Sequence, residues 1–170
     1  MRFSQVNQKA ERTASAVISA IGKEEPSLAD LITWLTDNFG IKFEVSPMDL
    51  SNHPVCGLVF QNPTTQAYKV VVDRNDSAER QRFSVCHELA HILREKELVF
   101  GFFDGNLENH NSEERFCNRF AAAFLMPEKS FRTKWASMSE NFLIKKYSIA
   151  EYFGVSKETV MYRALELGLQ

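Results

Sequence analysis

Two histidines lie one helical turn apart, with a glutamate beside the first, in the stretch His87-Glu88-x-x-His91. At about 100° per residue, His91 lies about 40° round a helix from His87, so both imidazoles can reach one ion. Glu88 falls to one side of the pair, where a carboxylate can act as a base on water beside the metal. The pattern predicts a metal site with His87 and His91 as ligands and Glu88 as the catalytic base.

The same spacing also fits an ordinary pair of surface histidines, and the neighbouring residues decide between the two. The positions around the motif are apolar: Phe83, Val85, Cys86, Leu89, Ala90, Ile92 and Leu93. Such a helix is expected to be largely buried, and a buried histidine pair without a partner is unfavourable. The surroundings therefore favour the metal site.

A catalytic zinc ion needs a third protein ligand and an open position for water. No third histidine follows at the spacing that metzincins use. The remaining candidates are acidic residues and one imidazole further along the chain: Asp104, Glu108, His110, Glu113 and Glu114.

Helical geometry favours Glu114 over Glu113. Glu113 shares its helix face with a bulky stripe suited to core packing: Phe116, Phe120 and Phe124. Glu114 shares its face with small residues that allow a close approach to the histidine helix: Cys117, Asn118 and Ala121. We therefore predict Glu114 as the third ligand, with His110 and Glu113 as alternatives. Asn118 is expected to hydrogen-bond one ligand imidazole.

The elements before the motif are two amphipathic helices and a small sheet. The helices are expected over Gln5–Ile21 and Leu28–Phe39, and Gly40 stops the second. Three short segments, rich in β-branched residues, predict a small antiparallel sheet: Ile41–Val45, Gly57–Gln61 and Tyr68–Val72.

The motif itself lies in a helix that the capping-box spacing of Asp76 and Glu79 opens and that ends near Arg94. Further helices are expected from Ser112 to Pro127, over Ile144–Phe153 and over Lys157–Leu167, the last two joined by a turn at Gly154. This order predicts an α+β fold. We expect a zincin-like metallopeptidase domain over residues 1–137 and a helix-turn-helix-like pair over residues 138–170, packed on the same domain.

Two stretches carry a resemblance to a known family. Arg80–Leu93 reads RQRFSVCHELAHIL, and Glu113–Pro127 reads EERFCNRFAAAFLMP. Together they resemble the ImmA/IrrE family of zinc metallopeptidases, whose second signature, E-x-x-x-N-x-F-A-A-x-x-L-M-P, has its Glu and Asn at Glu114 and Asn118. The tail IAEYFGVSKETVMYRALELGL is also similar to the family's C-terminal segment, from which it departs at Ile149, Thr159 and Ala164.

The resemblance implies a gluzincin-like fold in which Glu114 completes the zinc site. It further implies an endopeptidase that cleaves a cognate helix-turn-helix repressor of the XRE class and so relieves repression in a stress or mobile-element response. Some relatives resemble one half of a toxin–antitoxin pair. The alternative is a non-proteolytic, metal-containing regulator that binds a repressor or DNA through its C-terminal helices.

The C-terminal pair also places its apolar and glycine positions as a DNA-binding helix-turn-helix does. Its second helix offers only Lys157 and Arg163 as basic residues, opposed by Glu158 and Glu166. Phosphate contacts need more positive charge than this. We therefore expect a packed pair that closes the domain or holds a partner, and no direct DNA binding.

Composition and charge narrow the class of protein. The net charge of −2 argues against a strongly basic nucleic-acid binder. The first residues lack the apolar segment of a secretory signal, and the longest apolar run is too short to span a bilayer. The 3 cysteines form neither a C-x-x-C pair nor a disulfide framework. These features predict a protein of the reducing cytoplasm, without membrane association.

The substrate of such a peptidase is expected to lie along an exposed strand edge beside the metal helix, and Tyr68–Val72 is the candidate strand. A covered inner strand is the alternative interpretation. The spacing does not locate the group that stabilises the oxyanion. The candidates are the arginines and the tyrosines at Tyr68, Tyr147, Tyr152 and Tyr162.

Overall fold

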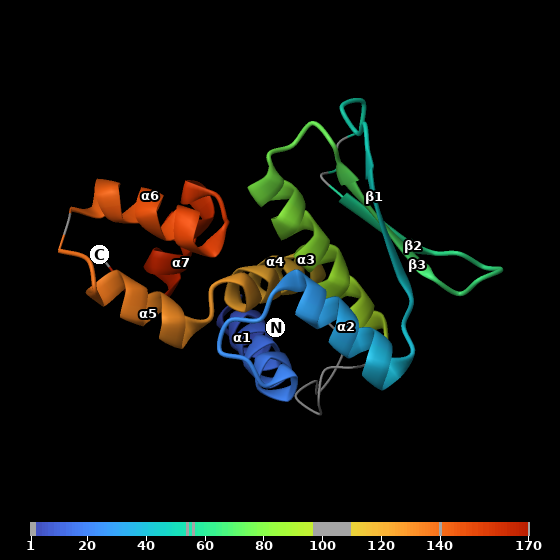
Figure 1. Ribbon diagram of the computed structural model, residues 1–170, viewed down its shortest axis with the longest axis horizontal. Helices are drawn as coiled ribbons and strands as arrows, with labels where there is room; N and C mark the ends of the chain where they lie inside the picture. Colours follow the sequence, from blue (N-terminus) through green and yellow to red (C-terminus); the bar gives the residue numbers. More distant parts are fainter. Residues whose placement is uncertain (1–2, 54, 56, 97–109, 140, 170) are drawn as a thin grey trace.

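The computed structural model describes residues 3–53, 55, 57–96, 110–139 and 141–169, which form seven helices and three strands (Figure 1). The first elements are α1 (Phe3–Ile21), α2 (Leu28–Phe39), β1 (Phe43–Met48), β2 (Gly57–Gln61) and β3 (Tyr68–Asp73). The later ones are α3 (Ala78–Glu95), α4 (His110–Leu125), α5 (Glu128–Ala136), α6 (Phe142–Phe153) and α7 (Lys157–Glu166). This order confirms the predicted α+β fold.

The core is built around α3 and α4, which pack directly on each other. The other face of α3 contacts β2 and β3, and α1 packs on α4. The predicted phenylalanine stripe of α4 is fully buried, with the Phe120 and Phe124 rings stacked at 5.9 Å between centroids. The α3 residues between the two histidines are equally enclosed, since Leu89 and Ala90 are fully buried. The core therefore fixes the helix pair that carries the candidate ligands.

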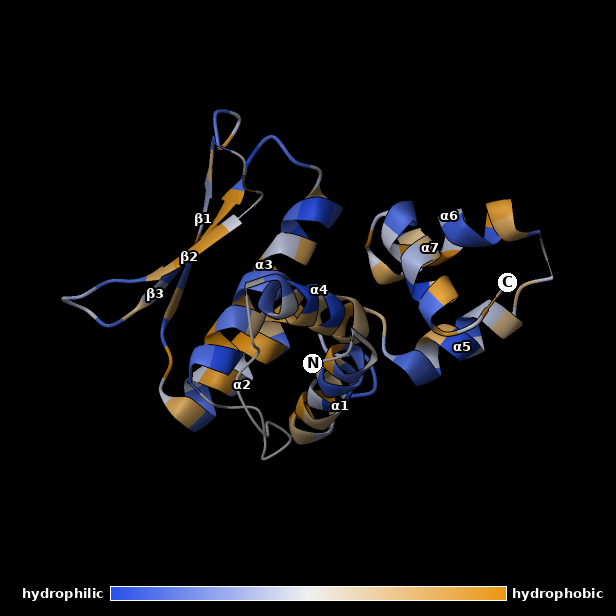
Figure 2. Cartoon of the chain, turned by 180° about the vertical axis from the view of Figure 1, so that it is seen from behind, coloured by the Kyte–Doolittle hydropathy of each residue, from blue (hydrophilic) through white to orange (hydrophobic). Residues whose placement is uncertain are grey.

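The sheet is mixed, so the predicted antiparallel sheet is wrong for one of its two pairs. The strand order is β1-β3-β2, with β1 parallel to β3 and β2 antiparallel to β3. Strand β3, the second strand of the β2–β3 hairpin, therefore lies between β1 and β2. The central β3 has Val70 and Val72 in the core, whereas the mostly hydrophobic β2 lies at an edge (Figures 1 and 2).

The helix caps follow local chemistry, with one correction. Ser27 and Asp30 form a reciprocal capping box on α2, and Gly40 ends that helix with φ +66°. The start of α3 was predicted to be capped at Asp76, but the N-cap is Ser77, whose hydroxyl accepts from the Arg80 amide. The Asp76 carboxylate pairs with the Arg80 side chain instead, at 3.3 Å.

The C-terminal helices form a cluster beside the end of α4 (Figure 1). The predicted helices α6 and α7 are present, with Gly154 in the left-handed conformation between them and Ser156 as the N-cap of α7. The sequence did not predict α5, whose buried residues are Phe131 and Trp135.

An ionic network joins this cluster to the core. Arg163 of α7 is fully buried, and its guanidinium pairs with Glu11 of α1 and donates to the Met126 carbonyl at 3.2 Å. Arg119 of α4 also pairs with Glu11, at 2.7 Å, and with Glu166 of α7. Within the described residues, no helix is both long and apolar enough to cross a membrane.

Candidate metal centre

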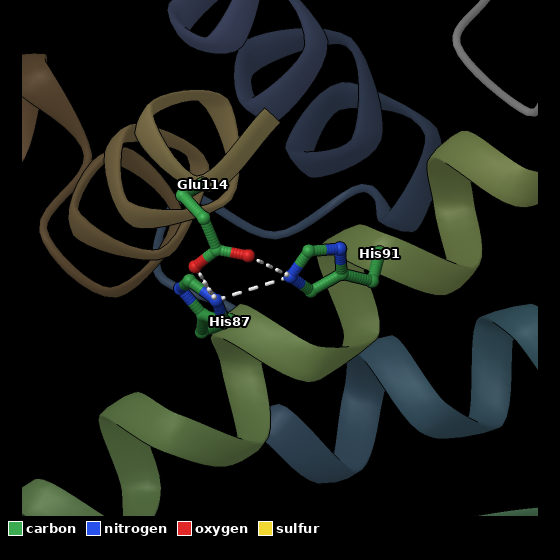
Figure 3. A group of neighbouring side chains, drawn as sticks. All are labelled: His87, His91 and Glu114. Carbon is green, nitrogen blue, oxygen red and sulfur yellow. Dashed lines mark hydrogen bonds and ion pairs between the residues drawn. The ribbon is translucent and has the colours of Figure 1, made fainter. Parts of the chain in front are cut away.

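Three side chains from two helices converge at one point between α3 and α4 (Figure 3). The Nε2 atoms of His87 and His91 lie 3.2 Å apart. Glu114 of α4 directs its carboxylate at both, with Oε2 at 3.3 Å from His87 Nε2 and Oε1 at 3.2 Å from His91 Nε2. The structure thus brings together the three residues that the sequence predicted as metal ligands, in a group that could hold an ion.

The outer nitrogen of each imidazole also has a polar partner. Nδ1 of His87 lies 3.1 Å from Oδ1 of Asn118, one helical turn after Glu114. Nδ1 of His91 lies 3.2 Å from Oε1 of Glu113, which Arg94 holds at 2.6 Å. Because both partners are oxygens that only accept, each Nδ1 must carry the proton. Each Nε2 then presents a lone pair to the centre of the group.

This arrangement fits a divalent cation. Two imidazole lone pairs and a carboxylate face one another with no donor among them, which is unfavourable unless a positive charge lies at the centre. Protonating His87 is disfavoured because burial, and then the neighbouring His91, lower its pKa. In tetrahedral zinc sites with bonds of about 2.0–2.1 Å, neighbouring ligand atoms lie about 3.3–3.4 Å apart. The two Nε2 atoms, 3.2 Å apart, come close to that spacing, and each lies within 3.3 Å of one of the two carboxylate oxygens of Glu114.

Glu88 lies beside the group and does not join it. Its side chain is buried at 7% exposure, and it lines the same cleft as the three candidate ligands. Burial raises the pKa of Glu88 to about 7. The chain makes room for this carboxylate at Gly57 of β2, where a β-carbon would lie 3.0 Å from Glu88 Oε1. A carboxyl with such a pKa can both accept and release a proton near neutral pH.

The cleft above these residues has a volume of about 1140 Å³, a floor and two side walls. Its floor is α3 together with His87, His91 and Glu114, which we call the metal group. One side is the edge strand β2, through Gly57, Leu58 and Val59, and the other is the start of α7, through Ser156 and Thr159. Of the two interpretations of Tyr68–Val72, an exposed edge or a covered inner strand, the structure confirms the inner strand, because β3 is paired on both sides. The strand edge at the cleft belongs to β2.

The role of Glu113 differs from the prediction. Its helical position suggested core packing or an alternative ligand, yet its carboxylate reaches sideways to His91 and Arg94. The signal was present in the spacing, since Arg94 follows His91 by three residues on the facing helix. Asn118 contacts His87 as its spacing predicted.

The remaining sequence candidates are the other possible ligands and the possible oxyanion-stabilising residues. Asp104, Glu108 and the side chain of His110 are outside the described residues. None of the four tyrosines lines the cleft: the Tyr68 hydroxyl donates to Glu95 at 2.8 Å, and Tyr152 contacts Glu25. Of the arginines, Arg80 and Arg94 line it.

A comparison with known protein families assigns the chain to one of them. Residues 37–165 match the family model of the IrrE N-terminal-like domain, which is classed as a peptidase family. Because the match spans more than half of the sequence, the chain belongs to this family, as the ImmA/IrrE resemblance predicted. No curated protein matches the chain significantly.

A solved structure has a similar fold. It is a Mycobacterium tuberculosis transcriptional regulator with a TM-score of 0.59 and 20% sequence identity. The alignment covers 96% of this chain and 51% of the regulator, so the chain spans about half the length of that protein. At this identity the likeness shows the fold alone.

Proposed function

We propose that this member of the IrrE N-terminal-like family is a zinc-dependent endopeptidase that cleaves a helix-turn-helix repressor of the XRE class. The single observation that carries the proposal is the convergence of His87, His91 and Glu114 on one point, with Glu88 beside them in an open cleft. Zinc is the ion that two imidazoles and one carboxylate with an open position suit best.

The metal would be held by the two Nε2 atoms and the Glu114 carboxylate. Asn118 and Glu113 fix the imidazole rings, so these two residues keep the lone pairs directed inward. When bound, zinc lowers the pKa of a coordinated water and polarises the carbonyl of the scissile bond.

Glu88 carries out the proton transfers in this proposal. Its carboxylate takes a proton from the attacking water and returns it to the amine nitrogen that leaves. Both transfers require a pKa near the working pH, which burial supplies by raising the pKa of Glu88 to about 7. Gly57 helps because it has no β-carbon. A β-carbon there would lie 3.0 Å from Oε1 of Glu88 and would crowd the carboxylate.

The substrate would lie as an extended segment along β2. Gly57, Leu58 and Val59 line the cleft at the sheet's edge, where a strand leaves main-chain groups unpaired. An added strand there would run beside the metal group.

The repressor substrate rests on the family resemblance, and the comparison structure, a transcriptional regulator, is compatible with a role in gene control. A stress or mobile-element response, or a toxin–antitoxin pair, would be the setting. Two features of α7 disfavour direct DNA binding. Its basic Arg163 is fully buried against Glu11, and its first turn lines the cleft.

The test is co-expression with a short XRE-type repressor encoded beside the gene. Wild-type protein should shorten the repressor, and mass spectrometry should locate one cut. Glu88→Gln should keep its zinc and lose cleavage by about 10²–10⁴-fold, the usual contribution of a general base. Glu128→Gln, an exposed glutamate paired with Arg132 on α5, is the matched control and should cleave normally. Equal cleavage by Glu88→Gln would remove Glu88 from this role.

A further inference from the structure

The turn between α6 and α7 is fastened to the metal helix by one arginine. Nη1 of Arg82, on α3, donates to the carbonyl of Phe153 at 2.6 Å and approaches that of Gly154 at 3.3 Å. These carbonyls lie at the C-terminal end of α6, where the helix dipole favours a cation. Arg82 therefore serves as a cap for α6, whose last residue, Phe153, lies 71 residues further along the chain.

The centre of the turn is a glycine, Gly154, whose backbone and neighbours both disfavour a side chain. Gly154 has φ +61°, and a β-carbon there would clash with Nη1 of Arg82 unless the arginine moved away from the turn. The glycine thus meets two requirements, the left-handed backbone and the close approach of the arginine. The contact between α3 and the turn is fixed from both sides.

The consequence of this contact is seen directly after the turn. Ser156 caps α7 and, with Glu158 and Thr159 of its first turn, lines the cleft opposite β2. The far end of α7 is held separately, through Arg163 and Glu166 to α1 and α4. Arg82 thus holds the end of α7 that faces the cleft.

We propose that the α6–α7 turn is the second wall of the substrate groove, and that Arg82 is the positioning residue that sets its distance from β2. This inference rests on the proposed function. An extended segment of a protein substrate would lie on β2 by main-chain pairing and contact the first turn of α7 with its side chains. The helix-turn-helix-like pair then selects substrate, in place of contacting DNA.

The position of the turn can be measured without any substrate. Spin labels at Phe60→Cys on β2 and Lys157→Cys in the first turn of α7 use two exposed positions, with Cys56→Ser to avoid a third label, since Cys86 and Cys117 are buried. Electron–electron double resonance should give one narrow distance in this parent and with Arg82→Lys added. Arg82→Ala and Gly154→Ala should broaden or lengthen it.

Two variants serve as matched controls. Gly40→Ala places alanine at φ +66°, as a helix C-cap with no atom within 4 Å, so it carries the backbone strain without the contact. Arg74→Ala removes an exposed arginine that pairs with Asp49. Both should leave the distance unchanged. A distance that Arg82→Ala and Gly154→Ala also leave unchanged would overturn the positioning role.

The groove itself is tested with a peptide library from a proteome digest and the zinc-loaded enzyme. For the peptide that wild type cleaves best, Arg82→Ala should raise KM about tenfold with kcat changed less than about twofold, because binding and not chemistry is affected. Arg82→Lys should recover most of the loss, and zinc content should stay constant. If the turn moves while KM and the cleavage sites stay unchanged, the proposal that the turn is a wall of the substrate groove is wrong.

Failure of the proposed function gives a different result. If wild type cleaves no peptide and no repressor, the peptidase proposal and the groove fall together. The distance measurement would still show whether Arg82 holds the turn, so the two failures are told apart.

Discussion

The metal group and the α6–α7 turn line one cleft, but they are held in place by different means. His87 and His91 belong to one turn of one helix, and Glu114 reaches them from a helix that packs directly on it. The α6–α7 pair is fixed by side chains from α1, α3 and α4, through Glu11, Arg82 and Arg119. The first region depends on local helix geometry, and the second depends on a few long-range polar contacts.

This difference predicts which substitutions should disturb each region. A change outside α3 and α4 should leave the metal group intact, whereas the loss of one distant side chain should move or loosen α7. The predictions below test that contrast, from the largest expected effect to the smallest.

The largest effect is expected at the buried network of α7. Arg163→Met leaves Glu11 with Arg119 as its remaining partner and removes the donor to Met126. Breaking a buried ion pair costs about 3–5 kcal/mol, and we expect about 3 because Glu11 is a quarter exposed. Chemical denaturation measures the loss. Arg74→Met, at an exposed pair, should cost about 0.5 kcal/mol or less.

The same variant sharpens the contrast between the two regions. Zinc affinity of Arg163→Met, measured well below its unfolding transition, should match wild type. Loss of zinc in step with loss of α7 would show that the two regions are one unit and that the contrast drawn above is false.

The next effect concerns the carboxylate behind His91. Glu113→Gln keeps the size of the side chain and weakens its hold on His91 Nδ1 and on Arg94. Partners of this kind usually contribute about 10–100-fold to metal affinity, so competition with a chromogenic chelator should show a loss in that range. If Glu113→Gln abolished binding as completely as Glu114→Gln, Glu113 would be a ligand itself.

A smaller effect is expected where β2 meets the catalytic carboxylate. In Gly57→Ala the new methyl group would lie 3.0 Å from Glu88 Oε1 and 3.3 Å from the Val71 carbonyl, so the carboxylate must shift. A shift of this kind should lower kcat about tenfold with zinc content unchanged. Unchanged kcat would mean that the Glu88 side chain adjusts without loss of function.

The smallest effect lies outside both regions and gives a baseline. The Lys23 ammonium, and then the Ser27 amide and hydroxyl, lower the pKa of Asp30 to about 2 from 3.8. A lowered pKa means that the folded state holds the charged form, so this stabilisation is present above about pH 4 and is lost as the pH falls towards 2. Melting temperatures of Asp30→Asn should therefore depend less on pH over that window than those of wild type. Identical pH profiles would show that the cap contributes nothing.

Much of the site could be predicted because its residues are spaced so that they lie on one face of a helix. The i, i+4 histidines and the Glu114–Asn118 pair each lie on one face of one helix, so their directions follow from the sequence. The bounds of α2 were predicted correctly for a similar reason, since Ser27 and Gly40 mark both ends.

What could not be predicted depends on contacts between distant elements. Strand β3 lies between β1 and β2. No local sequence pattern indicates which strand of the β2–β3 hairpin pairs with β1. The helix α5 has only Phe131 and Trp135 facing the core, too few to give a helical period. Arg163 was read as a basic surface residue, because its partner Glu11 is 152 residues away. The division of the chain near residue 137 stays a prediction.

X-ray absorption at the zinc edge of stoichiometrically loaded protein tests the central claim most directly. The account predicts only nitrogen and oxygen neighbours at about 2.0–2.1 Å, with the scattering pattern of two imidazoles, and loss of that zinc in Glu114→Ala. Protein that binds no zinc, or a sulfur neighbour at about 2.3 Å, would contradict it.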